Sequence, residues 1–308
     1  MLVEVINLNK SFDEKKVLDN ISFKLDEGNI TGLVGRNGSG KTTLLKIIVG
    51  IYKHDSGKVK ICGNSLEINP KTIEHIAYLP DRFDYFDYNK VKNIPDFYEI
   101  LYPNFDREFF VSEISKNNIN LNQSVRNFSK GEKNLLGLIT VLASNTKVIL
   151  IDEILDGMDV INKRLITNYL LDAKDKGCAV FASSHELSDL TGICDNILYL
   201  SKDGKLSSTS EENNLNLHKI QLVVKDDLPN EIKEKAIILS NIGRVYTLLI
   251  DSKKEDLEKI LADENVVQYD NLEIKVEDYF YLEEGAKKWV ILRNCLELPW
   301  KDLAYGFC

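Results

Sequence analysis

The chain has 308 residues, which is enough for about two domains at the usual size of ~150 residues each. Hydrophobic residues make up 44% and charged residues 28%, a composition typical of a globular protein that buries a real core. Wholesale disorder, collagen-like and disulfide-scaffold classes are therefore excluded. With 39 Lys and Arg against 48 Asp and Glu, the net charge is −9, which gives no general attraction to nucleic acid or anionic lipid.

The cysteines and the first residues indicate the compartment. Five cysteines are scattered without a CxxC pair or a histidine at metal-ligand spacing, which favours reduced thiols in a cytosolic protein. The start, MLVEVINLNKSFDEKK, lacks the basic-then-apolar order of a signal peptide, so we expect no secretion. The apolar runs are far shorter than the ~20 residues that cross a bilayer, so another chain would have to span a membrane.

Strand-like and helix-like segments alternate through the first two thirds of the chain. Two β-rich stretches precede a helical pattern at 42–51, and residues 81–145 later interrupt the alternation with further helical patterns. Runs that are apolar on both faces suit a parallel sheet packed between helices. We predict an α/β fold with a mainly parallel sheet, an antiparallel β subdomain and a helical insertion at about 81–145. Short apolar runs predict strands at 2–8, 21–25, 30–35, 148–151, 179–183 and 197–200.

The polar stretch SSTSEENN precedes a change of composition near residue 213. We therefore expect one domain at 1–213 and a small α+β accessory domain at 214–308, which dimerises, regulates or braces the first. Near the C-terminus, Trp289, Leu292 and Leu296 lie close to one face of a predicted helix. Core packing or self-association explains that stripe better than membrane insertion, because the charges around it are mixed.

The strongest motif is GRNGSGKT at 35–42, which matches G-x-x-x-x-G-K-[ST] between a predicted strand and a predicted helix. Its glycines let the backbone wrap a phosphate chain, and the aligned N–H groups and helix N-terminus supply positive potential. Lys41 would reach the β- and γ-phosphates, and the Thr42 hydroxyl would ligate Mg²⁺. The alternative is a plain glycine turn that starts a helix. The predicted nucleotide-binding residues here are Gly35, Arg36, Asn37, Gly38, Ser39, Gly40, Lys41, Thr42 and Thr43.

An apolar strand that ends in two carboxylates is the second signal, in VILIDEILDGMD at 148–159. Asp152 at the strand end can hold Mg²⁺, and the adjacent Glu153 can polarise an attacking water. Two acids at a strand end are, by themselves, usually a solvated turn. Here they follow the phosphate-binding motif and precede Gly157 and Asp159, which favours the metal and catalytic roles.

With these motifs in place, residues 1 to about 210 resemble the ATP-binding subunits of ABC transporters. The resemblance implies a P-loop NTPase core that binds ATP and Mg²⁺ and hydrolyses ATP, with Lys41, Glu153 and His185 as catalytic residues. His185, in FASSHELSDL, matches the family's switch histidine, which contacts the γ-phosphate, although a lone histidine is more often structural. Phe12 is at the position of an aromatic that stacks on adenine, but it could equally belong to the core.

The segment NFSKGEKNLLG at 127–137 resembles a divergent form of the family signature LSGGQ. Phe128, Lys130 and Glu132 replace Leu, Gly and Gln, whereas Ser129 and Gly131 remain. The resemblance implies that Ser129, Lys130 and Gly131 face the γ-phosphate of a nucleotide held by a second subunit. Outside this setting, SKGE is an ordinary helix N-cap with a charged first turn.

The clearest departure from the family is LPD at 79–81, where Gln is usual in the loop that links the metal site to the permease. The Asp81 carboxylate has no amide donor but can still bind Mg²⁺ or its water, so the expected metal-site residues are Thr42, Asp152 and Asp81. We expect this change from Gln to Asp81 to affect the geometry that couples the metal site to the permease more than it affects nucleotide binding. An acidic residue here and an SKG-type signature resemble the drug- and peptide-export branch, whose ATPase subunits also carry a C-terminal extension.

Phe and Tyr residues are dense between residues 81 and 110. In such transporters this region receives a cytoplasmic helix of the permease, so these aromatics indicate a partner interface. Some of them must also form the core of the helical insertion. The sequence leaves the choice between interface and core open.

The leading functional hypothesis is an ATPase subunit of an export-type ABC transporter, held through its permease at the cytoplasmic face of the cell membrane. Its expected partners are ATP, the permease and a second ATPase subunit, in a homodimer or related heterodimer. Peptides, antibiotics or other amphipathic compounds are the expected cargo. The alternative is a soluble regulatory ATPase of the same family that is not coupled to transport. A ribosome- or DNA-acting relative is disfavoured by the acidic balance, and we expect no nucleic-acid partner.

Overall fold

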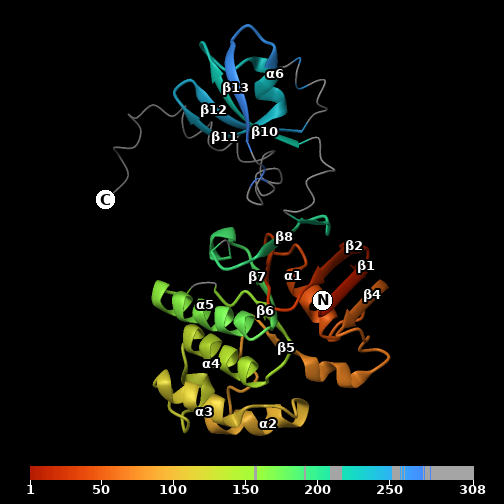
Figure 1. Cartoon of the computed structure of the whole chain (residues 1–308), viewed down its shortest axis with the longest axis vertical. Helices are drawn as coiled ribbons and strands as arrows, with labels where there is room; N and C mark the ends of the chain where they lie inside the picture. The colour runs from red at the N-terminus through yellow and green to blue at the C-terminus, as the bar shows by residue number, and fades with distance from the viewer. Residues whose placement is uncertain are drawn as a thin grey trace, which may run out of the picture. The chain divides into compact units, whose positions relative to one another are not determined.

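The computed structural model describes residues 1–155, 158–190, 192–208 and 217–251, and then residues 257, 259, 261–272, 274 and 278. The chain forms two compact units, Met1–Ser208 and Thr209–Cys308 (Figure 1). Among the described residues, the strands form two sheets in the first unit and one in the second. The stripe of Trp289, Leu292 and Leu296 lies outside the described residues.

A small antiparallel sheet lies at the N-terminus of the first unit. Its strands are β1 (Val3–Phe12), β2 (Lys15–Leu25) and β4 (Ser56–Ile61), in the order β2-β1-β4. One face of this sheet is apolar and buried, and the register of β1 against β2 shifts after Val5 and again after Leu8. The predicted antiparallel β subdomain is confirmed.

The larger sheet has the strand order β5-β6-β7-β3-β8-β9, and all neighbours are parallel except β8 and β9. The strands β3, β6 and β7 are buried along their whole length, because helices or the other sheet cover both faces. Since these strands are parallel, their carboxyl ends meet at one edge, where the sequence places its motifs. The strands are β3 (Ile30–Val34), β5 (Ile76–Leu79), β6 (Val148–Asp152), β7 (Ala179–Ser184), β8 (Asn196–Leu200) and β9 (Leu206–Ser208).

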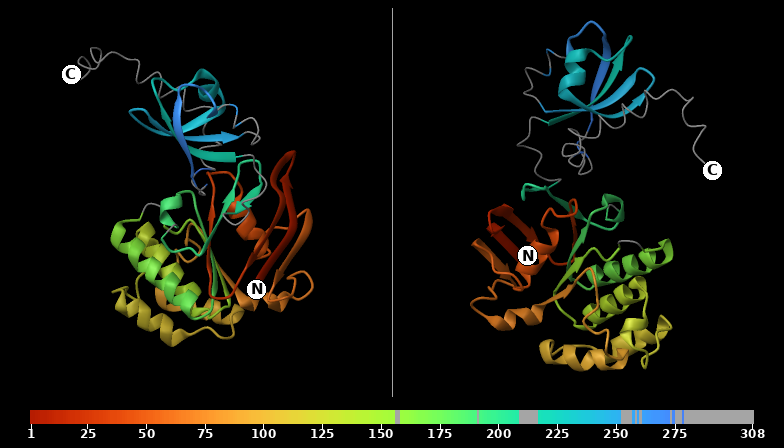
Figure 2. Two further views of the ribbon diagram at one scale, coloured as in Figure 1. Left: turned by 45° about the horizontal axis from the view of Figure 1, so that its top comes forward. Right: turned by 180° about the vertical axis from the view of Figure 1, so that it is seen from behind.

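Helices cover both faces of the larger sheet. On one face, α1 (Lys41–Ile48) packs between the two sheets, and its apolar side chains join theirs in one core cluster. On the other face lie α4 (Lys130–Ala143) and α5 (Val160–Asp175), as Figure 2 shows from two sides. The predicted helical insertion follows β5 and consists of α2 (Ile94–Leu101), α3 (Arg107–Lys116) and α4. Short 3₁₀ turns lie at Pro70–His75, Val91–Asn93, Val125–Asn127 and Leu187–Asp189.

The aromatic residues of this insertion divide between its interior and its surface. Phe83 and Phe110 are fully buried, whereas the side chains of Tyr85 and Tyr88 are 62% and 92% exposed. Phe86 connects the two groups, because its ring contacts the rings of both Phe83 and Tyr85. The aromatics therefore form a core and also an exposed surface.

The second unit contains a four-stranded antiparallel sheet in the order β11-β12-β10-β13. Along the chain its named elements run in the order β-α-β-β-β. Leu257 and Leu261, which are helical, pack with the buried residues of β10 and β12. The predicted α+β fold of this part is confirmed. The elements are β10 (Leu217–Val224), α6 (Asn230–Lys235), β11 (Ala236–Ile242), β12 (Val245–Asp251) and β13 (Val266–Leu272).

Candidate active site

The turn between β3 and α1 has an unusual backbone that glycine permits. Gly38 and Gly40 have φ values of 80° and 108°, which side chains rarely tolerate, and Gly40 forms the N-cap of α1. A Cβ on Gly35 would lie 2.5 Å from the Leu200 carbonyl oxygen, whereas one on Gly38 would meet nothing within 4 Å. The turn therefore packs closely against the sheet on one side and leaves its other side open.

Polar groups inside this turn fit a phosphate ligand. The Ser39 hydroxyl is buried and has no hydrogen-bond partner among the residues that the structure describes. A buried hydroxyl without a partner is costly, and phosphate oxygens are acceptors that would satisfy it. The N-terminus of α1 adds positive potential at the same place.

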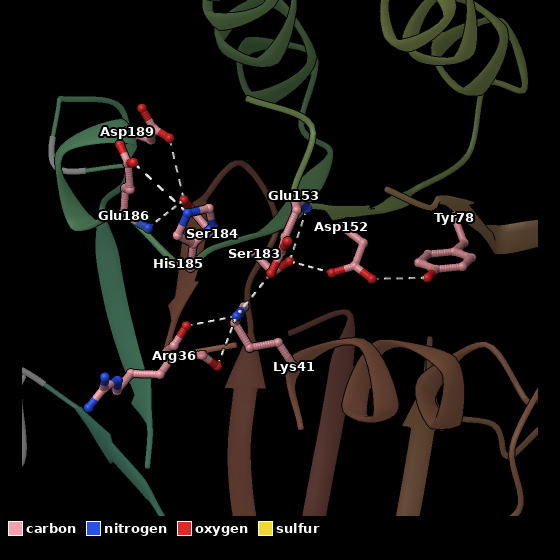
Figure 3. Close-up of polar contacts among 11 residues, drawn as sticks. Arg36, Lys41, Tyr78, Asp152, Glu153, Ser183, Ser184, His185, Glu186 and Asp189 are labelled. Atoms are coloured by element: carbon pink, nitrogen blue, oxygen red, sulfur yellow. Dashed lines mark hydrogen bonds and ion pairs between the residues drawn. The ribbon is translucent and has the colours of Figure 1, made fainter. Parts of the chain in front are cut away.

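Lys41 is the first residue of α1, and its ammonium lies inside the turn. The Nζ atom donates to the Gly35 carbonyl oxygen at 2.7 Å and to the Arg36 carbonyl oxygen at 3.4 Å. It also forms an ion pair with Glu153, with 3.0 Å between Nζ and Oε1 (Figure 3). The Lys41 side chain is 3% exposed and that of Glu153 is 23% exposed, so solvent screens this pair only in part.

Asp152 ends β6 and is completely buried. The Ser183 hydroxyl donates to its Oδ1 at 2.6 Å, and the Tyr78 hydroxyl lies 3.4 Å from its Oδ2 (Figure 3). Burial raises the pKa of the Asp152 carboxyl above its ordinary value, although hydrogen bonds with Ser183 and Thr42 act in the opposite direction. Burial also raises the pKa of Tyr78, so its hydroxyl keeps the proton that it donates.

Glu153 follows Asp152 with a left-handed backbone. Its φ is 48°, a conformation that costs a residue with a side chain roughly 1–2 kcal/mol. Its N–H donates to the Ser183 hydroxyl oxygen at 3.1 Å and to the Ser183 carbonyl oxygen at 3.2 Å, and these bonds help to offset the cost. The result is a carboxylate that lies against Lys41 beside the phosphate-binding turn.

His185 follows directly after β7. Its Nε2 lies 3.9 Å from the Glu186 carboxylate, and the side chain is partly exposed. The neighbouring Ser184 hydroxyl accepts the Glu186 N–H at 2.9 Å and lies 3.4 Å from the Asp189 carboxylate. Figure 3 shows that this loop borders the site formed by Lys41, Asp152 and Glu153.

The donor set at Asp152 fits a Mg²⁺ ion that accompanies a nucleotide. The Thr42 side chain interacts with the Asp152 carboxyl and lowers its pKa, so a hydroxyl and a carboxylate lie near each other. In the described part of the chain, no group of three or more His, Cys, Asp or Glu side chains could hold a metal. Mg²⁺ commonly takes one or two protein oxygens and completes its octahedron with phosphate oxygens and water. Thr42 and Asp152 meet that requirement.

Asp81 lies two residues beyond β5 and is exposed. Its charge raises the pKa of Asp152, a through-space effect smaller than that of burial. It also lines a pocket of about 330 Å³ together with Lys130 and Lys133 of α4. Asp81 therefore lies near the start of α4.

Phe12 is the last residue of β1 and is 42% exposed. Its ring meets that of Tyr52 edge to face at 5.7 Å, and Nζ of Lys10 lies 5.0 Å from the ring centroid. Phe12 is therefore not a core residue.

The segment that resembles the family signature opens α4. Ser129 is the N-cap: its hydroxyl oxygen accepts the Glu132 N–H at 3.3 Å, and its own N–H donates to Glu132 Oε2 at 2.8 Å, which together form a capping box. Lys130 is exposed and begins the helix, and a Cβ on Gly131 would have no neighbour closer than 3.8 Å. The N-cap interpretation of SKGE is confirmed. Gly157, which follows the two acids at the end of β6, lies outside the described residues.

Two residues of the site were not anticipated, Ser183 and Tyr78. Each donates to Asp152 from a strand adjacent to β6, and Ser183 is the register partner of Asp152. Knowledge that β6 and β7 are neighbours would have identified Ser183. No local motif marks either residue.

In the described part of the chain, every helix is too short or too polar to cross a membrane. This result bears on the helices alone.

The chain is similar to several known proteins. A family profile described as "ABC transporter" matches residues 18–156. The ABC transporter ATP-binding protein YtrB of Bacillus subtilis is 29% identical over 93% of this chain and 99% of that protein. The lipopolysaccharide export system ATP-binding protein LptB of Haemophilus influenzae is 30% identical over 66% of this chain and 88% of that protein. The ribose import ATP-binding protein RbsA of Clostridium perfringens is 27% identical over 68% of this chain and 44% of that protein.

The fold of the first unit also occurs in solved structures. One, titled "Structure of ATP binding subunit of ABC transporter", superposes with a TM-score of 0.61 at 24% identity. The match covers 68% of this chain and 90% of that one. The predicted α/β fold of the P-loop NTPase type is confirmed.

Proposed function

Because this chain belongs to the ATP-binding proteins of ABC transporters, which are ATPases that drive transport, we propose that it powers a separate permease from the cytoplasmic face of the membrane. One observation carries the assignment of the site. Lys41, Asp152 and Glu153 meet at the carboxyl ends of β3 and β6, beside a turn with an open side and a buried hydroxyl without a partner among the described residues.

Each residue of the site has a role in this proposal. Lys41 and the amides of the turn bind the phosphates of ATP and neutralise their charge. Thr42 and Asp152 hold Mg²⁺, which supplies further charge neutralisation on the phosphates when it is bound. Glu153 orients and polarises the attacking water, and His185 contacts the γ-phosphate. Phe12 stacks on the adenine, since its exposed ring lies at the edge of the β subdomain.

A second ATPase subunit completes the site in this proposal. The N-terminus of α4, with Ser129, Lys130 and Gly131, faces the γ-phosphate held by the partner. Ser129 and Lys130 are exposed and Gly131 is half-buried, which supports access by a ligand from outside the subunit. The pair is a homodimer or a heterodimer with a related chain. ATP favours the closed pair and hydrolysis permits it to open, because the bridging γ-phosphate is then lost.

The exposed aromatic surface of the helical insertion is the proposed docking place for the permease. Tyr85, Tyr88 and Phe97 are large side chains that solvent reaches, and Ile100 and Leu101 of α2 extend the same exposed apolar set. Contiguous exposed apolar residues commonly indicate a partner site. Asp81 borders this segment, so a movement of the permease would act near the metal-binding carboxylate.

We further propose that the transporter is an exporter of peptides, antibiotics or other amphipathic compounds. Support comes from Asp81 and the SKG-type signature, which resemble the export branch. The relatives include both an export protein and an import protein, so the direction of transport has to be measured. The second unit is proposed to be an accessory domain that serves dimerisation, regulation or bracing.

The deciding experiment compares Glu153→Gln with the unchanged protein. We expect Glu153→Gln to bind ATP with Mg²⁺ and to pair in a stable dimer, while hydrolysis falls by at least about 100-fold. Hydrolysis at the normal rate in that variant contradicts the assignment. Copurification of the unchanged protein with an integral membrane protein distinguishes the transporter subunit from the soluble regulatory ATPase. Truncation after residue 213, followed by measurement of dimerisation, tests the accessory domain.

A further inference from the structure

We propose that Ser183 is a positioning residue for ATP hydrolysis, whose hydroxyl holds the carboxylates of Asp152 and Glu153 in their different orientations. The inference rests on the proposed function of this site. It assigns a role to a residue that touches neither nucleotide nor metal in that proposal.

The geometry of one hydroxyl group carries the inference. Ser183 Oγ donates its proton to Asp152 Oδ1 at 2.6 Å and accepts the Glu153 N–H at 3.1 Å. A hydroxyl has one donor and two acceptor positions, so both bonds can exist together. Ser183 thereby connects the side chain of one acid to the main chain of the next (Figure 3).

These two connections matter because consecutive residues of a strand point to opposite faces. Asp152 lies buried at the end of β6. Glu153 follows the strand with a left-handed φ, and its carboxylate lies against the ammonium of Lys41. The turn thus needs a group that stabilises the Glu153 main chain without releasing Asp152, and the Ser183 hydroxyl does both.

Thr42 also interacts with Asp152, but among the described hydroxyl groups near the site only that of Ser183 bonds both to the Asp152 carboxylate and to the Glu153 N–H. The Tyr78 hydroxyl lies 3.4 Å from the other carboxylate oxygen of Asp152, a longer and weaker contact. Ser184, the next residue, interacts with Glu186 and Asp189 and not with the two acids. Loss of the Ser183 hydroxyl therefore removes the shortest hydrogen bond that the structure gives to Asp152.

We expect loss of the Ser183 hydroxyl to weaken the part of nucleotide binding that depends on Mg²⁺ and to slow turnover. Removal of a group that orients a metal ligand typically lowers metal affinity or activity roughly 10–100-fold. We expect kcat of Ser183→Ala to fall by a similar factor. We expect the increase in ADP affinity on addition of Mg²⁺ to fall by a similar factor as well. ADP affinity in the presence of EDTA depends on the phosphate-binding turn and stays unchanged. KM for ATP changes little by comparison.

The experiment measures ADP binding by calorimetry, with MgCl₂ and with EDTA, together with the ATPase kinetics of the full chain. Ser183→Thr keeps the hydroxyl and is expected to restore most of the lost affinity and rate. Ser144→Ala is the matched control, because Ser144 is also buried and donates to the Thr140 carbonyl oxygen, within the helical insertion. Thermal unfolding of all three variants shows whether each is folded.

The results separate this inference from the proposed function. The inference holds if Ser183→Ala, but not Ser183→Thr or Ser144→Ala, loses the Mg²⁺-dependent gain and kcat. It is overturned if Ser183→Ala behaves like Ser144→Ala, or if affinity in EDTA falls as far as affinity in Mg²⁺, which is what a purely structural role predicts. In both cases the proposed function stands, provided that the unchanged protein binds and hydrolyses nucleotide. An unchanged protein that binds no ADP overturns both.

Discussion

The Lys41 ammonium and the Glu153 carboxylate lie 3.0 Å apart, although the two residues belong to motifs far apart in the chain. Lys41 begins α1, and Glu153 directly follows β6. The lysine is nearly enclosed by the turn that it serves, with a second bond to the Gly35 carbonyl oxygen. This contact joins the phosphate-binding turn to the carboxylate that we propose to act on water. Phosphate oxygens that bind Lys41 would therefore compete with Glu153 for the same positive charge.

Replacing Lys41 tests the charge at the centre of the site. We expect Lys41→Met to weaken ATP binding and to lower hydrolysis at least about 100-fold, because a donor aimed at the phosphates is lost. Calorimetry with ATP and a phosphate-release assay measure the two effects. Lys24→Met changes an exposed lysine of β2 and is expected to leave both quantities as they are. Equal effects of the two substitutions would contradict the role given to Lys41.

Replacing Phe12 tests the proposed adenine contact. Stacking of a base on an aromatic side chain contributes about 1–3 kcal/mol, so we expect Phe12→Ala to bind ATP roughly 5–150-fold more weakly. Inorganic triphosphate, which has no base, is expected to compete equally well in both proteins. Phe109→Ala is the control, since Phe109 lies on α3 and contacts Lys176. An unchanged ATP affinity in Phe12→Ala would remove Phe12 from the site.

The packing of α4 against β5 predicts a cost at Gly137. Alanine favours a helix by about 1 kcal/mol over glycine, but a Cβ here would lie 2.6 Å from Leu79 Cδ1 and 2.9 Å from Phe83 Cδ2. Overpacking typically costs about 1–3 kcal/mol, so we expect Gly137→Ala to lower the free energy of unfolding. Unfolding in denaturant measures this change in the free energy of unfolding. Gly131→Ala on the same helix meets no such contact and should not destabilise the protein, and a stabilised Gly137→Ala would refute the packing argument.

Glu113 on α3 predicts a pH-dependent contribution to stability. Burial alone would raise the pKa of its carboxyl, but hydrogen bonds from Lys116 and Tyr169 outweigh burial and lower the pKa below 4.5. A lowered folded-state pKa contributes stability that is present above pH 4.5 and is lost as pH falls through the folded value.

We therefore expect Glu113→Gln to unfold at lower denaturant concentration than the unchanged protein at pH 7, with a smaller difference at pH 3.5–4. The exposed Glu108 of the same helix supplies the control substitution Glu108→Gln, which should show little difference at either pH. A difference that grows as pH falls would mean that the pKa of Glu113 is raised in the folded state.

Much of the site could be anticipated without coordinates, because its chemistry depends on short, contiguous patterns. The turn at 35–42 needs glycines where φ is positive and a lysine at the start of the helix, and both requirements can be read locally. The same holds for the Ser129 N-cap with Glu132 three residues later, and for Asp152 at the end of an apolar run. Hydrophobic periodicity likewise predicted the buried strands β3, β6 and β7 and the helix α1, but it did not predict β4, β5, β9 or α5.

Contacts between distant segments could not be obtained in this way. Ser183 reaches Asp152 because β6 and β7 are neighbours in a particular register, and the spacing along the chain does not encode that register. The exposure of Tyr88 and the burial of Phe83, two aromatics in one short segment, depend on which side chains α4 covers. Local backbone preferences act within a few residues, whereas strand order and side-chain burial follow from the packing of the whole domain. The motifs thus identify the chemistry, and the packed sheet determines which residues hold it in place.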